Sequence, residues 1–223
     1  MNINDLGVNF LINLIAGVVG ILIVLWIERQ RRPNIFMKVG EPGRITVADP
    51  LKRPPASWLN VEVHNRSIPS WLRWVYDGEP ALSCRAWITF HHLDGHRVFN
   101  REMYVRWSET PEPRVRFTPI EDGKVARLVG VQDTVDIPPG EYTNLDVVFR
   151  VDGEDACYGW NNESYLHNWR HPSWQLDKGR FIAKVRVKTG GREFVDAFMI
   201  VNDVPYQDFR LETIDNNLKR RLK

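Results

Sequence analysis

Hydrophobic residues are distributed in two different ways along this chain. Between Leu6 and Ile27 they form one run of 22 residues that carries no charge. As a helix this run would extend about 33 Å, enough to cross a hydrocarbon core of roughly 30 Å. A buried helix of a soluble protein is the alternative, but no polar face interrupts the run after Leu14. The pattern therefore predicts a transmembrane helix over residues 6–27, within an N-terminal segment of residues 1–32.

Apolar and polar residues alternate along much of the remaining chain. Residues 58–65 (WLNVEVHN) place Leu59, Val61 and Val63 on one face of an extended strand, with polar side chains on the other. Pro111, Pro113 and Pro119 indicate a loop. We expect further strands at 34–39, 83–91, 97–107, 125–137, 145–151, 180–188, 193–201 and 209–212, with hairpin turns at Asp94-Gly95 and Gly190-Gly191.

This succession of short strands predicts a mainly β fold. Antiparallel β-sandwiches and barrels are both built in this way, and we favour an immunoglobulin-like sandwich over residues 33–213. The Cys…Trp…Cys pattern of antibody domains is absent, so the prediction concerns architecture only. Residues 214–223 form a basic C-terminal tail.

The charges that flank the apolar run predict its orientation. Arg29, Arg31 and Arg32 follow the run, whereas Asp5 is the only charged side chain before it. Because basic flanks remain on the cytoplasmic side, the N-terminus is expected outside and the soluble domain in the cytoplasm, with the three arginines at the membrane surface. The start of the chain also lacks the basic residues of a cleaved signal peptide.

Small and polar residues lie along one side of the predicted helix. At 100° per residue, Asn9, Asn13, Ala16 and Gly20 fall within about 60° of one another. Small residues four apart allow two helix backbones to approach, and Asn in lipid favours an interhelical hydrogen bond. The stripe predicts self-association or a membrane partner; ordinary use of Gly and Ala is the alternative.

Composition limits the function classes. Hydrophobic residues make up 43% and charged residues 26%, and the net charge of +2 is too near neutral to suggest nucleic-acid binding. Cys84 and Cys157 form no CxxC pair, and in the cytoplasm we expect them to be reduced thiols.

The most unusual stretch is 157–176 (CYGWNNESYLHNWRHPSWQL), which is rich in aromatic and amide side chains. Such residues make good contact surfaces, and a long loop inside a compact domain is often functional. Rings that plug the open end of a sandwich are the alternative. We expect a second aromatic group, which includes Trp71 and Trp74, at the same end of the domain. The candidate residues for binding a partner or ligand are Tyr158, Trp160, Asn161, Asn162, Tyr165, Trp169, Trp174, Trp71 and Trp74.

Signatures of catalysis and metal binding are weak. The chain has no GxSxG, GxxxxGK[ST], HExxH or GxGxxG motif. His91, His92 and His96 bracket a turn, but adjacent strand residues point to opposite faces. His167 and His171 have helical spacing, which Pro172 disfavours. We therefore predict no metal, no cofactor and no enzyme activity.

Several phrases of the chain resemble those of uncharacterised prokaryotic single-pass membrane proteins with a β-sandwich domain. These phrases are CYGWNNESY at 157–165, LDKGR at 176–180, VND at 201–203 and DFRLE at 208–212. The resemblance would cover most of residues 58–213. It implies a prokaryotic cytosolic module and transfers no site residue.

Together these patterns predict a membrane-anchored cytosolic binding module, an adaptor or sensor whose aromatic loop binds a protein or small ligand. One alternative is an exported receptor or adhesion domain of opposite topology. Another is a hydrolase that uses residues 157–174, with Glu163, Ser164 and His167 as candidate groups.

Overall fold

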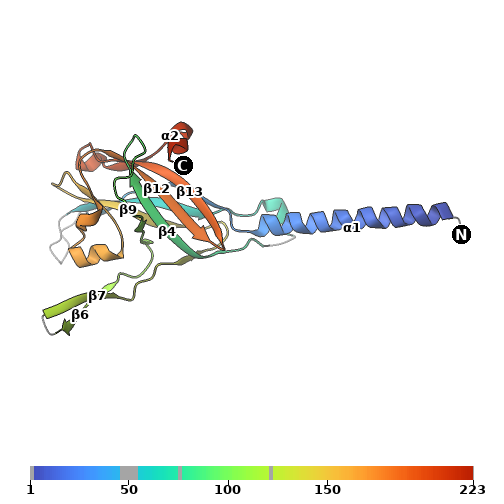
Figure 1. Ribbon diagram of the computed structural model, residues 1–223, viewed down its shortest axis with the longest axis horizontal. Helices are drawn as coiled ribbons and strands as arrows, with labels where there is room; N and C mark the ends of the chain where they lie inside the picture. The colour runs from blue at the N-terminus through green and yellow to red at the C-terminus, as the bar shows by residue number, and fades with distance from the viewer. Residues whose placement is uncertain (1–2, 46–54, 75–76, 121–122, 223) are drawn as a thin grey trace.

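The computed structural model describes residues 3–45, 55–74, 77–120 and 123–222. A single long helix, α1 (Ile3–Arg31), extends from one side of a β-rich domain, as Figure 1 shows. Its stretch Ile12–Arg31 is long and apolar enough to cross a membrane, and none of it is buried against the domain. The predicted helix is thus present, and its sides are free to face lipid.

Two six-stranded antiparallel sheets form the domain. The first has the order β1-β3-β9-β10-β11, with β2 also paired to β3, and the second has the order β14-β13-β12-β4-β5, with β8 also paired to β4. The strands of the first sheet are β1 (Ile35–Val39), β2 (Gly43–Ile45), β3 (Ala56–Asn65), β9 (Tyr142–Val151), β10 (Cys157–Gly159) and β11 (Gln175–Leu176). Those of the second are β4 (Ala81–His91), β5 (Met103–Tyr104), β8 (Val135–Ile137), β12 (Arg180–Thr189), β13 (Arg192–Val201) and β14 (Arg210–Thr213).

The main core lies between these two sheets. Leu59, Val61 and Val63 of β3 belong to the same buried cluster as Ile88 of β4 and Val185 of β12. The alternation read from the sequence therefore marks the inward faces correctly. β12 and β13 pair over their whole length across Gly190-Gly191, where φ is 52° and 76°. Both values are positive, as a two-residue type I′ hairpin turn requires.

One segment crosses from the second sheet to the first. Val105 N–H donates to Ala86 O of β4 at 3.1 Å, whereas Asp146 N–H of β9 donates to Arg106 O at 3.1 Å. Ser108 N–H then donates to Asn144 O at 2.9 Å. This crossing brings the side chains of residues 106–108 beside β9.

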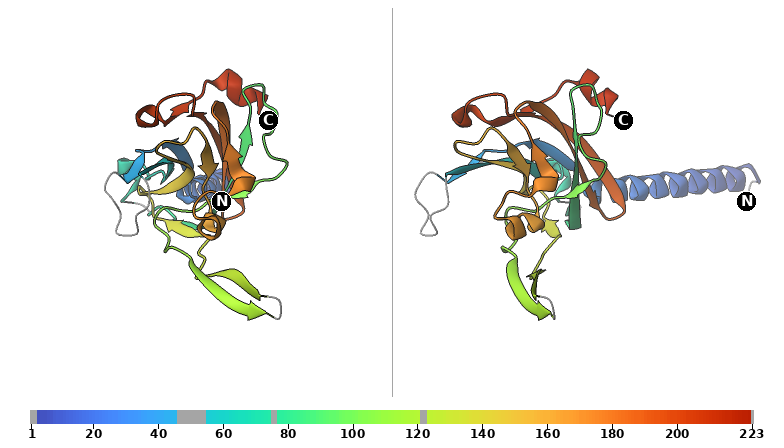
Figure 2. Two further views of the ribbon diagram at one scale, coloured as in Figure 1. Left: turned by 90° about the vertical axis from the view of Figure 1, so that its left-hand side faces the viewer. Right: turned by 60° about the vertical axis from the view of Figure 1, so that its left-hand side comes forward.

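Some sequence predictions were wrong. The proline-marked loop is a two-stranded hairpin, β6 (Arg114–Ile120) and β7 (Gly123–Val129), which projects from the domain in Figure 2. Pro119 is tolerated in β6 because an isolated hairpin has N–H groups that face solvent. The strand expected at 97–107 shrinks to β5. The strand expected at 125–137 is divided between the end of β7 and β8. The described residues form antiparallel sheets but no closed barrel.

The remaining short helices are η1 (Ser70–Leu72), η2 (Asn162–His167), η3 (Pro172–Trp174), η4 (Tyr206–Asp208) and α2 (Asn216–Arg221). α2 occupies most of the predicted basic tail. Leu218 and Leu222 pack beside Ile182 and Ala197, so the tail lies on the second sheet. Lys184 Nζ donates to Leu222 O at 2.6 Å and fixes that position.

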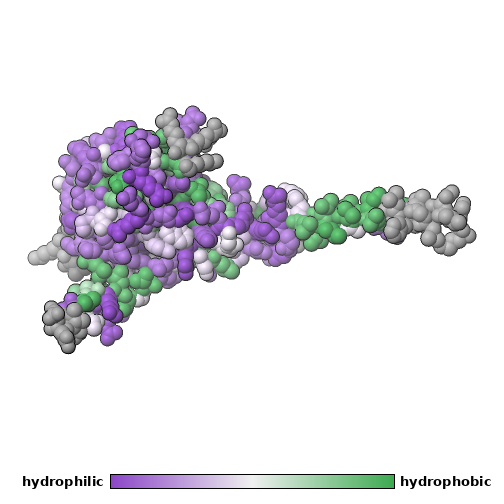
Figure 3. Space-filling view, viewed as in Figure 1, coloured by the Kyte–Doolittle hydropathy of each residue, from purple (hydrophilic) through white to green (hydrophobic). Residues whose placement is uncertain are grey.

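Several hydrogen bonds join the end of α1 and the residues that follow it to the domain. Glu79 N–H donates to Arg31 O at 2.9 Å, and Arg192 Nη1 donates to Pro33 O at 2.8 Å. Asn34 N–H donates to Asn65 Oδ1 at 3.2 Å. Figure 3 shows hydrophobic surface along the helix giving way to hydrophilic surface at this junction. The domain is therefore held against the end of the helix.

Candidate functional site

The aromatic stretch 157–176 is folded back onto the first sheet. Asn161 caps η2: its Oδ1 accepts from Ser164 N–H at 3.0 Å, while Ser164 Oγ accepts from Asn161 N–H at 3.2 Å. Asn168 and Trp169 then adopt positive φ values of 48° and 73°, which reverse the chain. The stretch is ordered by these local contacts.

Its rings form a second hydrophobic cluster, hereafter the aromatic cluster, on the face of the first sheet opposite the main core. The members are Ala56, Phe149, Val151, Tyr158, Trp160 and Trp169, with Trp58 and Tyr165 packed against them. Trp58 has its ring centroid 5.8 Å from that of Trp160 and 5.6 Å from that of Trp169, both edge to face. Trp160 and Trp169 are only 3% and 8% exposed, as the plug alternative expects. Trp174 lies in the main core.

A cleft of about 420 Å³ opens beside the aromatic cluster. We call it the Asp146 cleft. Ring and polar side chains from five segments line it: Arg44, Trp58, Asn60, Arg106, Ser108, Glu112, Asp146, Trp160, Tyr165 and Trp169. Its volume falls within the range of small-molecule pockets.

Asp146 is the most unusual group in this cleft. The residue is 8% exposed, and its Oδ1 accepts a hydrogen bond from Ser108 Oγ at 2.6 Å. Burial raises the pKa of Asp146 to about 6, against the opposing effects of the Ser108 hydrogen bond and the Arg106 charge. A carboxyl group with this pKa takes up a proton in a slightly acidic medium and can then donate as well as accept.

Arg106 organises the wall next to Asp146. It is 4% exposed, and its Nη1 donates to Pro111 O at 3.0 Å and to Asn162 Oδ1 at 3.2 Å. Its Nη2 donates to Thr110 O. The guanidinium carbon lies 5.6 Å from the ring centroid of Tyr165, a cation–π arrangement. Burial raises the pKa of Tyr165 to about 12, so this phenol stays neutral.

The polar half of the cleft was not predicted from the sequence. Arg106, Ser108 and Asp146 belong to no motif, and polar residues in an alternating strand normally face solvent. Asp146 instead faces a surface that the crossing segment and η2 cover. Of the predicted residues, Trp160, Tyr165 and Trp169 line the cleft, and Asn162 contacts it through Arg106.

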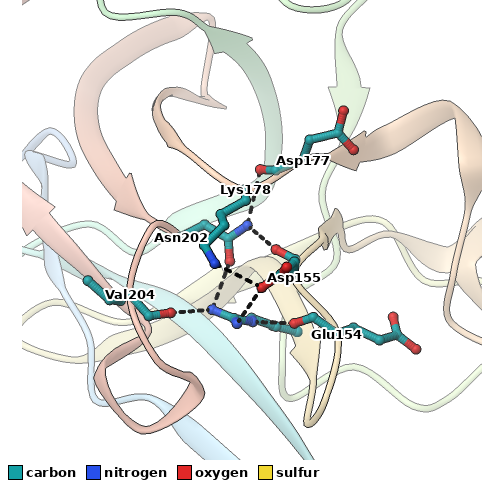
Figure 4. Close-up of polar contacts among 7 residues, drawn as sticks. Glu154, Asp155, Asp177, Lys178, Asn202 and Val204 are labelled. Atoms are coloured by element: carbon teal, nitrogen blue, oxygen red, sulfur yellow. Dashed lines mark hydrogen bonds and ion pairs between the residues drawn. The ribbon is translucent and has the colours of Figure 1, made fainter.

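A second buried arginine has a structural role. Arg150 Nε donates to Glu154 O at 2.8 Å, and its Nη1 donates to Val204 O at 2.9 Å and to Asn202 Oδ1 at 3.2 Å. Asn202 Nδ2 in turn donates to the carbonyl oxygens of Asp155 and Asp177 (Figure 4). These contacts tie three loops to β9, and Arg150 itself is only 5% exposed.

The expectation that Trp71 and Trp74 lie beside the 157–174 stretch was wrong. Trp71 belongs to η1, which adjoins the end of α1, whereas η2 lies on the far side of the domain from α1 (Figure 1). The ring of Trp71 stacks on that of Trp26 in α1, with the ring centroids 6.2 Å apart. Both ends of the crossing from β3 to β4 lie near the helix junction, where Asn65 and Glu79 bond to residues 31–34, and η1 stays beside them.

The residues predicted to lie at the membrane surface or to mediate helix association are on α1 or directly after it. Arg29 and Arg32 are exposed, and Arg31 Nη1 pairs with Glu28 Oε1 at 3.4 Å. Asn13, Ala16 and Gly20 lie on an exposed side of the helix, and a Cβ at Gly20 would meet nothing within 4 Å. Asn9 is part of the same helix, and its side chain lies outside the described part.

The histidines take part in ordinary contacts. His91 Nε2 lies 2.9 Å from Thr89 Oγ1, and His171 Nε2 lies 3.3 Å from Glu163 Oε2. Within the described ranges, no three His, Cys, Asp or Glu side chains are grouped to hold a metal ion. The candidate site is thus a cleft of aromatic and hydrogen-bonding groups.

Comparison with protein-family models, with curated proteins and with solved structures found no match to this chain.

Proposed function

We propose that this protein is a membrane-anchored cytoplasmic binding module that takes a small polar ligand, or a polar side chain of a partner protein, in the Asp146 cleft. The observation that carries the proposal is the buried Asp146 carboxyl at an aromatic-walled cavity of about 420 Å³. An immunoglobulin-like arrangement of the two antiparallel sheets is part of the same proposal.

The chemistry of the cleft favours ligand binding. Small-molecule sites combine ring surfaces, which supply contact area, with a few polar groups that fix orientation. Here the rings of Trp58 and Tyr165 accompany the Asp146 carboxyl. A ligand with a hydrogen-bond donor and a flat or apolar face could donate to the Asp146 carboxyl and pack against the rings.

The position of the cleft suits an anchored module. Arg29, Arg31 and Arg32 favour a cytoplasmic domain under the positive-inside rule. η2, which supports the cleft wall, lies on the side of the domain away from α1 (Figure 1). A cleft in this position is open to soluble ligands while α1 holds the domain at the membrane.

The two alternatives have less support. Ser164 is completely buried, and its Oγ is bonded to Asn161 at the cap of η2, which leaves no approach for a hydrolase substrate. An exported receptor would expose the arginine flank on the outer side, against the charge rule. It would also leave Cys84 and Cys157 as free thiols in an oxidising compartment.

The test is a ligand screen with two matched variants. The full chain in detergent is screened by thermal shift against amino acids, nucleosides, monosaccharides and short peptides. A ligand of the cleft should stabilise the wild type and Asp203→Asn, whose carboxylate pairs with Arg180 at the surface. The same ligand should bind Asp146→Asn at least tenfold more weakly than it binds the wild type. Equal affinity for both variants would contradict the proposal.

A further inference from the structure

The base of the domain carries an unusual concentration of exposed aromatic and basic side chains. Trp71 and Trp74 are 63% and 84% exposed, whereas Trp107, Trp160 and Trp174 are at most 3% exposed. Arg73, between the two exposed rings, is also exposed. Exposed tryptophans are costly in water unless another surface covers them.

Contact with α1 fixes the depth of this surface. The Trp71 ring stacks on Trp26, with centroids 6.2 Å apart and planes at 26°. Trp26 lies five residues before Arg31, near the end of the apolar stretch. If α1 spans the bilayer, as the proposed function requires, Trp26 is at the headgroup region. Trp71 must then lie at the same depth, where tryptophan is enriched in membrane proteins.

A basic cavity of about 420 Å³ is lined by Ser70 and Arg73, which are the sequence neighbours of Trp71 and Trp74. Four arginines contribute to its lining, two from the end of α1 (Arg31 and Arg32) and two from the loop before β4 (Arg66 and Arg73). Glu79 is the one acidic side chain among its described lining residues, and it lies 4.0 Å from Arg31. Arg32 and Arg73 have no acidic partner among the residues that the structure describes. The cavity therefore has positive charge that the domain itself does not neutralise.

We propose that this cavity binds the headgroup of an anionic phospholipid, while Trp71 and Trp74 insert into the interface beside it. Guanidinium groups pair with phosphate through two parallel hydrogen bonds, which makes Arg the suitable cation for this ligand. Basic pockets beside transmembrane helices on the cytoplasmic side bind such headgroups. The domain then contacts the membrane at a second point, which would fix its orientation on the bilayer. The inference rests on the membrane anchor of the proposed function and is independent of the Asp146 cleft.

The experiment compares lipid affinities of the full chain in a neutral detergent. Phosphatidylglycerol is titrated against phosphatidylcholine and followed by microscale thermophoresis. Arg66→Gln with Arg73→Gln should weaken phosphatidylglycerol binding about 25-fold, which corresponds to roughly 1 kcal/mol for each basic residue. The matched control, Arg114→Gln with Arg116→Gln, removes the same charge from the exposed strand β6, away from α1. It should leave the affinity within twofold.

A charge-conserving double variant distinguishes a loss of lipid binding from a loss of folding. Arg66→Lys with Arg73→Lys should retain at least a third of the wild-type affinity, because it keeps the charge and loses only the paired geometry. Equal binding of the two lipids by the wild type would overturn the headgroup site, as would equal losses in the β6 control. Release of the wild-type chain from membranes by alkaline carbonate would instead contradict the anchor itself.

Discussion

The indole ring of Trp71 lies against that of Trp26, with the ring centroids 6.2 Å apart. One ring belongs to α1 and the other to η1 of the domain, so their contact couples the two parts. Hydrogen bonds from Glu79 to Arg31 O and from Arg192 to Pro33 O add to the same joint. In the proposed membrane-anchored arrangement, a domain held in this way would present a constant face to the membrane and keep the opposite face, with the Asp146 cleft, toward the solvent.

The aromatic cluster should be important for stability. Trp160→Ala and Trp169→Ala each remove a buried ring, a change that typically costs about 3–5 kcal/mol. For a domain of this size we expect the melting temperature to fall by roughly 10 °C in each variant. Trp74→Ala, at 84% exposure, is the control and should change it by no more than about 2 °C. Calorimetry of the three variants checks this, and unchanged stability of the first two would show that the rings do not support the fold.

Stability should depend on pH through Asp146. Its folded pKa of about 6 exceeds the ordinary value of 3.8, so the native state binds a proton more tightly than the unfolded chain does. The contribution of this group to stability is therefore complete below about pH 4 and is lost as the pH rises to about 6 and above. The shift corresponds to a loss of up to about 3 kcal/mol.

Asp146→Asn removes this titration and keeps an oxygen that can accept from Ser108. Relative to the wild type, we expect the variant to gain stability between pH 4 and pH 7, measured by urea unfolding at several pH values. A difference between the two proteins that does not change over this range would show that Asp146 titrates normally.

Both cysteine thiols should be inert in the folded protein. Cys84 and Cys157 are completely buried, and burial raises the pKa of each thiol above its ordinary value. Because the thiolate is the reactive form, Ellman's reagent should react with neither residue in the native state and with both in guanidinium chloride. Rapid reaction of one thiol in the native state would indicate local opening of the strand that carries it.

The side of α1 that carries Asn13, Ala16 and Gly20 should mediate any self-association. Gly20→Leu would fill the exposed space beside the backbone and should reduce dimer formation at least threefold, as measured by energy transfer between labelled chains in vesicles. Val18→Leu, on the opposite side of the helix, should leave it unchanged. If the wild type and both variants give only the energy transfer expected for randomly mixed chains, the chain is monomeric.

The sequence predicted the main strands because they each bury one face. β3 and β12 alternate clearly, and the positive φ values at Gly190 and Gly191 fit the hairpin dipeptide. The β6–β7 hairpin was missed because it packs on little else: residues such as Phe117, 64% exposed, show no inward face to detect.

The candidate cleft was less predictable from the sequence. Its aromatic side was found from composition, but Arg106, Ser108 and Asp146 meet only because the crossing segment pairs with β9. That pairing is a contact between residues about forty positions apart, and no local pattern encodes it. Trp71 was assigned to the wrong end for the same reason, since its partner Trp26 lies on α1, far from it in the sequence.

The most direct test of the account is the side of the membrane on which the domain lies. Asn217→Cys places an exposed thiol on α2, and the two buried native cysteines need not be removed, so the wild type serves as the blank. Intact cells are treated with a membrane-impermeant maleimide and compared with lysed cells. The account predicts labelling of Asn217→Cys only after lysis. Labelling in intact cells would contradict a cytoplasmic binding module and would favour an exported receptor.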